Sequence, residues 1–401
     1  MQKPTHFGWL DAIRGAAALY VVSHHAVMQV MVVGDHAHDP MYRILQLLTM
    51  YGHYAVDVFI VLSGYCLTLP VIAKQQFGSL LVFYLRRTVR IVLPYYAALA
   101  VSLLLITFFI GENDGSHWAS FSLPISASDV FKHLLLTHQW FPNSAAKINP
   151  AFWSVGVEYQ IYFLFPLFYF LAKQLGYIKT FCYITFISYA LWGWCYIFNI
   201  FNPSSFGTSI YYCALFFMGM TAAHFANNPK QIANNQWLNK VESHARMIAN
   251  LAIFGILMVA ILNFVIGRFM PSLFFPLQIQ SFFVGLFFSI LLYLLGKNKL
   301  THKLSTQNSF IQNKLEWIGT MGFSLYLMHD PILAMVWKYL VTPLHLQAYW
   351  IQAFVELVLG IVASVAVTVV FYHLIELPCH RLSQSIRPRT VKQDQIIKIP
   401  Q

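Results

Sequence analysis

Charged residues are scarce in this sequence, and acidic residues are the scarcest. Only 10% of the 401 residues are charged, with 14 Asp and Glu against 25 Lys and Arg. A soluble globular domain carries about 25% charged residues, so this composition excludes an ordinary soluble protein. The hydrophobic fraction of 58% and the aromatic fraction of 17% indicate a polytopic membrane protein instead.

The sequence also has no contiguous basic patch, although its net charge is +11. The basic residues lie between apolar segments, where a charge bias at membrane borders explains them. We therefore expect no nucleic-acid partner. There are five cysteines, no Cys-x-x-Cys pair and no metal-like spacing. We interpret the cysteines as small core residues and expect no metal cofactor.

No internal repeat, low-complexity tract or linker divides the chain. This predicts one transmembrane domain over residues 1–380, followed by a basic cytoplasmic tail over 381–401. Asp11 and Arg14 interrupt the apolar run that a cleavable signal peptide needs. We expect the first helix to remain as a membrane anchor.

Ten segments of roughly 20 apolar residues are long enough to cross a bilayer. They lie near 10–32, 51–72, 91–110, 152–172, 179–199, 208–226, 248–267, 273–296, 318–340 and 350–374. With a cytoplasmic N-terminus, the inside segments hold 19 Lys and Arg and the outside segments hold 5, leaving out Arg14. Cytoplasmic loops are enriched in positive charge. We predict an all-α polytopic membrane protein of about ten transmembrane helices with both termini cytoplasmic. The longest connection, about 111–150, should contain a short amphipathic helix near Asp129–His138.

The first apolar segment contains Arg14, His24 and His25. An ionisable residue inside a membrane-length helix is costly and indicates a functional site. Helix geometry of about 100° and 1.5 Å per residue puts Arg14 and His25 on one face, about 16 Å apart. His24 falls about 80° from that line, which favours His25 as the functional histidine.

An arginine, ten intervening residues and a histidine, opened by LDAIRGAAAL, resemble the signature of the acyltransferase-3 family of bacterial integral-membrane O-acyltransferases. Later stretches resemble the family's other motifs in the same order. In one of them, SLYLMHDPIL (324–333), Met328 stands where the family usually has Trp. These stretches are VDVFIVLSGYCL (56–67), YLRRTVRIVLPYY (84–96), FWSVGVEYQIYFLFPLF (152–168), SLYLMHDPIL (324–333) and IELPCHRL (375–382). The resemblance covers nearly the whole chain. Many relatives carry a further SGNH-type esterase domain, which we expect to be absent here.

The resemblance implies that an acyl group, typically acetyl, moves from a cytoplasmic acyl-CoA to a hydroxyl group. The acceptor would be a cell-surface polysaccharide or its lipid-linked precursor, and the location the bacterial inner (cytoplasmic) membrane. The expected partners are acetyl-CoA as co-substrate, the glycan and membrane lipids. Direct transfer and an acyl-enzyme intermediate both stay open, although no nucleophile-elbow motif supports the second.

We predict His25 as the general base, because imidazole titrates close to neutral pH. Acyl-CoA is polyanionic at its nucleotide end, and arginine suits phosphate oxygens. The predicted CoA-binding residues are therefore Arg14, Arg86, Arg87 and Arg90. Ordinary positive-inside anchoring is the alternative for any single arginine of the last three.

A base needs an orienting partner, and the sequence offers Asp57, Glu158, and His329 with Asp330. We predict Asp57 and Glu158 as catalytic residues toward the outer face, nearer the glycan than CoA. For the fourth segment, Ser154 as a helix N-cap and Glu158 as a dipole partner remain an alternative.

We also expect a tunnel through the bilayer that links the CoA-binding arginines to His25. Tyr326, His329 and Asp330, spaced i, i+3, i+4, share a helix face. The predicted substrate-binding or tunnel-lining residues are Tyr326, His329, Asp330, Trp153 and Ser154. Glu376 is expected to be a local ion-pair partner.

A different class of function, a proton-coupled secondary transporter or exporter, would also suit ten helices with buried His, Asp and Glu. Transporters typically show inverted repeats and paired broken helices, and the sequence shows neither. A receptor or scaffold would leave the buried Arg14 and His25 unexplained.

Overall fold

The computed structural model describes residues 8–32, 39–111, 116–198, 200, 209–227, 236–270, 276–297 and 309–387. Within these ranges the chain is helical and has no strand, which confirms the predicted all-α class. The elements are α1 (Gly8–Met28), η1 (Gln29–Val32), α2 (Pro40–Thr49), α3 (Gly52–Lys74), α4 (Leu80–Leu105), η3 (Ile106–Ile110), α5 (His117–Ser122), α6 (Ala127–Leu134), η4 (His138–Trp140), α7 (Phe152–Leu175), α8 (Tyr177–Ile197), η5 (Ser209–Tyr211), α9 (Tyr212–Asn227), α11 (Gln236–Ser243), α12 (Ala245–Phe269), α13 (Leu277–Gly296), α15 (Ser309–Thr320), α16 (Gly322–Val336), η6 (Trp337–Val341), η7 (Thr342–Leu344), α17 (Tyr349–Phe371), η8 (Tyr372–Glu376) and α18 (Leu377–Ser385).

Seven helical stretches of the described residues are long and apolar enough to cross a membrane. They are Pro40–Lys74, Leu80–Ile110, Phe152–Leu175, Ser209–Asn227, Ala245–Phe269, Leu277–Gly296 and Tyr349–Ser385. The chain is therefore a multi-pass membrane protein. Three other predicted spans also form helices, α1, α8 and α16, outside this set. α1 carries several ionisable residues, and α16 has 15 residues against about 20 for a bilayer. The count of ten crossings and the cytoplasmic termini stay predictions.

Helix α4 begins at Leu80, well before the predicted start near residue 91. The Ser79 side chain accepts a hydrogen bond from the backbone N–H of Val82 at 3.5 Å and so caps the helix start. As a result, Arg86, Arg87 and Arg90 project from a formed helix.

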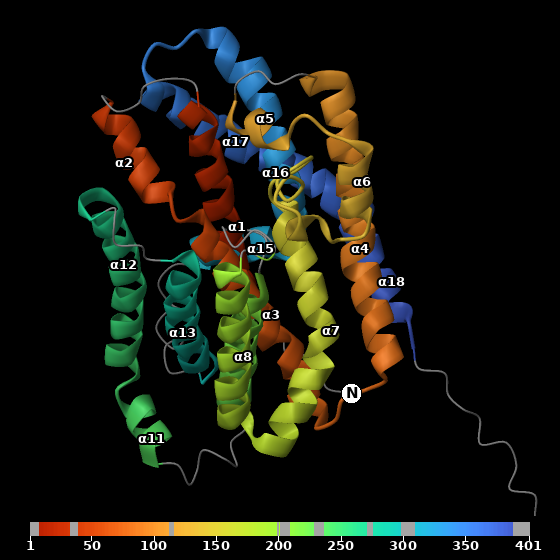
Figure 1. The fold of residues 1–401 in the computed structure, drawn as a ribbon, viewed down its shortest axis with the longest axis vertical. Helices are drawn as coiled ribbons and strands as arrows, with labels where there is room; N and C mark the ends of the chain where they lie inside the picture. Colours follow the sequence, from red (N-terminus) through yellow and green to blue (C-terminus); the bar gives the residue numbers. More distant parts are fainter. Residues whose placement is uncertain are drawn as a thin grey trace, which may run out of the picture.

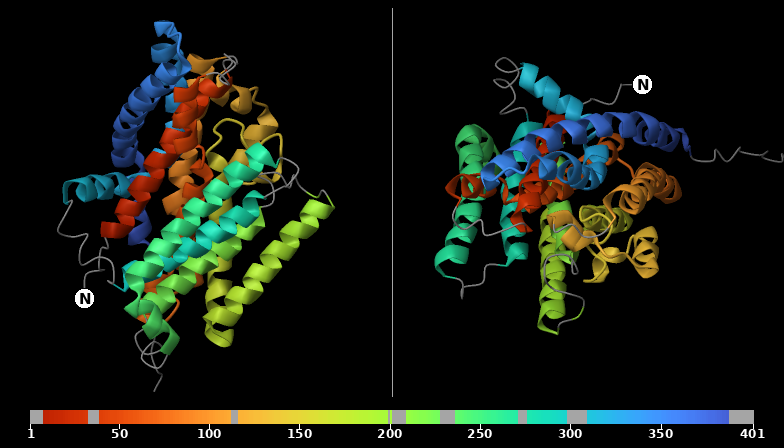
Figure 2. Two further views of the ribbon diagram at one scale, coloured as in Figure 1. Left: turned by 90° about the vertical axis from the view of Figure 1, so that its left-hand side faces the viewer. Right: turned by 90° about the horizontal axis from the view of Figure 1, so that it is seen from above.

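The predicted span 318–340 is broken near its start, which corrects that prediction. α15 ends at Thr320 and α16 starts at Gly322, with Met321 between them at φ −105° and ψ 10°. Figure 2 shows α15 lying across the direction of the long helices. Because the chain changes direction at Met321, α16 packs against both α1 and α17. α16 carries Asp330.

The loop prediction is partly confirmed. The amphipathic helix expected near Asp129–His138 is α6, which opens with a capping box between Ser126 and Asp129. It ends at Leu134, because Leu136 takes a left-handed φ of 54°. His138 instead begins the short turn η4.

Glycines allow the closest helix contacts beside the site. A Cβ on Gly64 of α3 would overlap the carbonyl oxygen of Phe216 in α9, and one on Gly219 would overlap that of Val61. α1 meets α15 in the same way through Gly15. Small residues at such crossings let membrane helices pack backbone to backbone.

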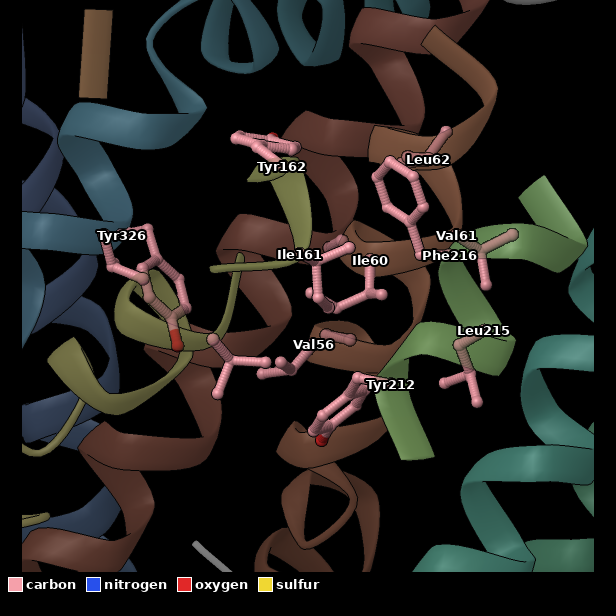
Figure 3. Close-up of a cluster of buried hydrophobic side chains, with 14 of the residues drawn as sticks. Val56, Ile60, Val61, Leu62, Ile161, Tyr162, Tyr212, Leu215, Phe216 and Tyr326 are labelled. Atoms are coloured by element: carbon pink, nitrogen blue, oxygen red, sulfur yellow. The ribbon is translucent and has the colours of Figure 1, made fainter. Parts of the chain in front are cut away.

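An apolar core fills the space between α3, α7, α9 and α16 (Figure 3). Val56 and Ile60 of α3 pack with Ile161 of α7, and Phe216 of α9 lies beside them. Tyr326 of α16 borders the same cluster. The core therefore packs α3, α7, α9 and α16 against one another beside the site.

The bundle has two distinct ends (Figure 1). Helices α2, α5 and α6 lie at one end, and α11 and the start of α4 lie at the other. We call the second the basic end, because Lys74, Arg86, Arg87 and Arg90 lie on the helix segments there. The positive-inside rule predicts that this end is cytoplasmic.

Candidate active site

His25 near the end of α1 contacts Asp330 of α16. The Nδ1 atom of His25 lies 2.7 Å from Oδ1 of Asp330. A carboxylate at this position accepts the Nδ1–H of a neutral imidazole, which leaves the lone pair on Nε2. One fifth of the His25 side chain is exposed, whereas Asp330 is 1% exposed. The pair thus combines a partly exposed imidazole with a buried carboxylate that orients it.

Asp330 is held in place from its other side. Its Oδ2 accepts a hydrogen bond from the backbone N–H of Ala151 at 3.2 Å, at the start of α7. The Asn149 side chain accepts from the same N–H at 3.0 Å and donates to the carbonyl of Leu327 at 3.0 Å. These bonds tie the start of α7 to α16, so the orientation of the carboxylate follows from the packing of two helices.

The neighbouring histidine, His24, faces elsewhere. Its Nδ1 donates to the carbonyl of Thr49 at 2.8 Å, and its ring lies 5.1 Å from that of His25. Arg14 and His25 both lie against α16, at Gly322 and Asp330 respectively. The predicted shared face of Arg14 and His25, with His24 turned away, is confirmed.

His329 lies beside the pair. Its Nδ1–H donates to the carbonyl of Tyr326 at 2.8 Å, and its ring centroid is 5.1 Å from that of His25. Its Nε2 is buried, has no hydrogen-bond partner among the described residues and lies 3.9 Å from Oδ1 of Asp330. His329 therefore presents an unshared lone pair to the carboxylate that orients His25.

A cavity of about 560 Å³ opens among α1, α3, α4, α7, the end of α15, α16, η8 and α18. This volume is within the range of about 300–1,000 Å³ that small-molecule sites have. Its charged lining is mixed, with three arginines, three carboxylates and one histidine. These residues are Arg14, Arg87, Arg90, Asp11, Glu158, Glu376 and His380.

Two of the cavity arginines, Arg14 and Arg87, are held by neighbouring side chains. Arg14 donates to Oδ1 of Asp11 at 2.6 Å and to Sγ of Cys66 at 2.9 Å. The guanidinium carbon of Arg87 lies 5.5 Å from the ring centroid of Tyr162, within cation–π distance. Pre-positioned guanidinium groups lose little freedom when they bind an anion.

Glu158 lines this cavity together with the arginines. Its Oε1 accepts hydrogen bonds from the hydroxyls of Ser63 and Tyr162. Because Tyr162 also faces Arg87, Glu158 belongs to the same polar cluster as the predicted CoA-binding residues. The prediction that Glu158 lies with the glycan and away from CoA is not supported by this placement.

The other predicted residues divide between the cavity and its surroundings. Ser154 and Tyr326 line the cavity and share a hydrogen bond of 2.7 Å between their hydroxyls. Trp153 is 8% exposed and packs against Tyr212, with ring centroids 5.9 Å apart, outside the cavity. Asp57 is fully buried near the hydroxyls of Tyr212 and Ser281 and also lies outside it.

Arg86 points away from the other arginines. Its guanidinium donates two hydrogen bonds, of 3.0 and 2.7 Å, to the carbonyl of Ile386 just after α18. It does not line the cavity. Its position fits a structural tie at the basic end, and its predicted role in CoA binding has no support here.

Sequence reasoning missed several cavity residues. Asp11, Ser63, Cys66 and Tyr162 all lie within stretches already matched to family motifs, but nothing in their spacing singled them out. Glu376 was expected to be a local ion-pair partner. It lines the cavity and accepts hydrogen bonds from the backbone N–H of Ser324, at 3.1 Å, and from its hydroxyl.

The cavity approaches His25 without reaching it. Tyr326 lines the cavity, and its ring lies 5.7 Å from that of His329, which in turn contacts His25. His25, His329 and Asp330 do not line the cavity. The structure thus places a cavity lined by arginines and carboxylates at the basic end and an oriented imidazole farther along α1, separated by the rings of Tyr326 and His329.

The site lies in a multi-pass helical membrane protein, and the comparisons identify the class of that protein. A family model described as an acyltransferase domain matches residues 7–373. The chain belongs to that family, the acyltransferase-3 family.

Two curated proteins are similar to parts of this chain. An uncharacterized protein of Haemophilus influenzae is 35% identical over 138 residues, which are 33% of this chain and 56% of the relative. Acyltransferase MdmB of Streptomyces mycarofaciens is 28% identical over 171 residues, which are 41% of this chain and 40% of the relative. The chain thus spans about half the length of the curated relatives it matches. No solved structure matches it.

Proposed function

We propose that this protein transfers an acyl group, most simply acetyl, from a cytoplasmic acyl-CoA to a hydroxyl of a cell-surface glycan or its lipid-linked precursor. We place it in the bacterial inner membrane, with the basic end in the cytoplasm. The observation that carries the proposal is the 2.7 Å contact between His25 and Asp330, which lies beyond the end of the arginine-lined cavity, across the rings of Tyr326 and His329. Membership of an acyltransferase family supports the reaction class.

In this reaction Nε2 of His25 takes the proton from the acceptor hydroxyl as its oxygen attacks the thioester carbonyl carbon. The C–S bond then breaks, and the leaving CoA sulfur takes the proton back from His25. Asp330 keeps Nδ1 protonated and stabilises the imidazolium that forms between the two steps. The base ends the cycle in its starting state, so no further acid is needed.

The arginines bind the phosphates at the CoA end of the cavity. Arg87 and Arg90 lie one helical turn apart on α4, and Arg14 faces them from α1. Asp11 and Glu158 hold the guanidinium and tyrosine groups in place through hydrogen bonds. In the proposed complex, phosphate oxygens replace water around the cations while these carboxylates keep the cavity close to neutral.

Membrane vesicles that contain the protein, labelled acetyl-CoA and bacterial surface glycan test this function. We expect label in the glycan and free CoA thiol in equal amounts, both absent from vesicles without the protein. A secondary transporter would instead move a solute without releasing CoA thiol, and that result would refute acyl transfer.

Replacing both Arg87 and Arg90 with Ala should weaken acetyl-CoA binding by about tenfold or more, because a hydrogen bond to a charged group contributes about 1.5–3 kcal/mol. Equilibrium binding of labelled acetyl-CoA to the purified protein measures this. Arg86→Ala is the matched control, since Arg86 lies at the same end but bonds to Ile386. Unchanged affinity in the double variant would point to a role of Arg87 and Arg90 in topology alone.

A further inference from the structure

We propose that His25, His329 and Asp330 form a binding site for a divalent transition-metal ion, and that the bound ion inhibits acyl transfer. The inhibition rests on the proposed function above, whereas the binding does not. One ligand atom from each residue lies within 4.8 Å of the other two. The cluster is therefore a two-histidine, one-carboxylate set gathered from α1 and α16.

The distances bracket those of a real metal site. In a tetrahedral zinc site the metal–ligand bonds of about 2.0–2.1 Å put neighbouring ligand atoms roughly 3.3 Å apart. Here Nδ1 of His25 is 2.7 Å and Nε2 of His329 is 3.9 Å from Oδ1 of Asp330. Shifts of about half an ångström would bring both contacts to this spacing. The two histidine nitrogens lie within 4.8 Å of each other.

His329 has the surroundings of a metal ligand. A ligating imidazole almost always donates its other ring N–H to a carbonyl or carboxylate, which fixes the tautomer. The Nδ1–H of His329 donates to the carbonyl of Tyr326, so its Nε2 carries the lone pair. That Nε2 is fully buried, and none of the described residues forms a hydrogen bond with it. A buried polar atom without a partner is costly, and an ion would satisfy it.

The donor set selects the kind of ion. Two imidazoles and one carboxylate suit Zn²⁺, Ni²⁺ and Cu²⁺, whereas Mg²⁺ and Ca²⁺ prefer oxygen ligands alone. Three protein ligands leave the fourth position of a tetrahedral ion open. His25 is the exposed member of the set and supplies the route of entry.

A bound ion would block the base by a shift of one proton. Neutral His25 has a single ring proton, which the contact with Asp330 keeps on Nδ1. When Nδ1 binds the metal, that proton must reside on Nε2, and Nε2 then has no lone pair to accept the proton of the acceptor hydroxyl. The ion also occupies the carboxylate that would stabilise the imidazolium. Inhibition should therefore leave acyl-CoA binding at the arginines unchanged.

Zinc titration of the purified, detergent-solubilised protein against a coloured chelator tests the site without any activity assay. We expect about one Zn²⁺ per chain, no competition from Mg²⁺, and at least tenfold weaker binding in His329→Gln. His373→Gln is the matched control, because His373 is exposed and remote from the cluster. Unchanged binding in His329→Gln would refute the site. If that variant fails to fold, Asp330→Asn removes the anionic ligand instead, and unchanged zinc binding there would refute it equally.

Inhibition is measured in the vesicle assay. Zn²⁺ should abolish transfer reversibly, a chelator should restore it, and His329→Gln should need at least tenfold more zinc. Loss of activity on adding the chelator alone would mean that the ion is required, and would overturn the inhibitory role. Zinc binding as expected in a protein that transfers no acyl group would refute the proposed function and leave the metal site standing.

Discussion

Replacing His25 with Ala is expected to lower acyl transfer by about a hundredfold or more, which is the typical contribution of a general base. The imidazole is the partly exposed base of the pair, whereas the Asp330 carboxylate is buried. The methyl side chain of Ala has no group that can accept the proton. Binding of acetyl-CoA should stay the same, because His25 does not line the arginine cavity. The labelled vesicle assay measures transfer, and equilibrium binding measures the amount of folded protein.

His24→Ala is the matched control for this variant. It removes an adjacent histidine from the same helix, but one that donates to the carbonyl of Thr49 and does not face Asp330. We expect its transfer rate to stay within a few-fold of the wild type. Normal transfer by His25→Ala would refute the proposed mechanism while leaving the family assignment intact.

Asp330→Asn is expected to lower kcat by about a hundredfold or more and to leave the KM for acetyl-CoA unchanged. The amide oxygen of Asn can still accept the N–H of Ala151, so the variant should fold. Its NH₂ group then faces Nδ1 of His25 and can only donate, which forces the ring proton onto Nε2. In serine proteases the same exchange of a carboxylate for an amide leaves the geometry intact and imposes the wrong histidine tautomer.

A lower kcat with an unchanged KM distinguishes a role of Asp330 in positioning His25 from a role in folding. A structural defect would reduce the number of acetyl-CoA binding sites per chain, whereas loss of the correct tautomer would not. Asp57→Asn provides the comparison, since Asp57 is an equally buried carboxyl that the sequence also offered as the partner of the base. A loss of kcat as large in Asp57→Asn as in Asp330→Asn would remove the special role of Asp330.

Helical spacing predicted which of the candidate residues share one face of a helix. Arg14, His24 and His25 lie on one helix, so their relative directions follow from 100° per residue alone. The placement of Arg87 and Arg90 in one cavity follows equally from their spacing of three residues on α4. The α15–α16 break at Met321 was not predictable in this way. Gly319 and Gly322 flank Met321, but glycine is also frequent inside continuous membrane helices.

The identity of the carboxylate that contacts His25 shows what helical spacing cannot predict. Asp57, Glu158 and Asp330 were all reasonable partners for His25, and each lies on a different helix from it. Their distances from His25 depend on helix crossings and rotations, which depend on many small contacts such as those of Gly64 and Gly219. Sequence spacing carries no information about such distances between separate helices.

By itself, the sequence determined the membrane class, the all-α fold, the family and the residues that share one face of one helix. The membrane class and the fold follow from composition and apolar segments, the shared helix face follows from local geometry, and the family follows from the resemblance of several ordered motifs. Only the tertiary structure decided that Asp330 orients His25, that Glu158 joins the arginines, and that Arg86 turns away to the carbonyl of Ile386. The physical reason is that these contacts join helices far apart in sequence, and packing alone sets the rotation and depth of each helix against its neighbours.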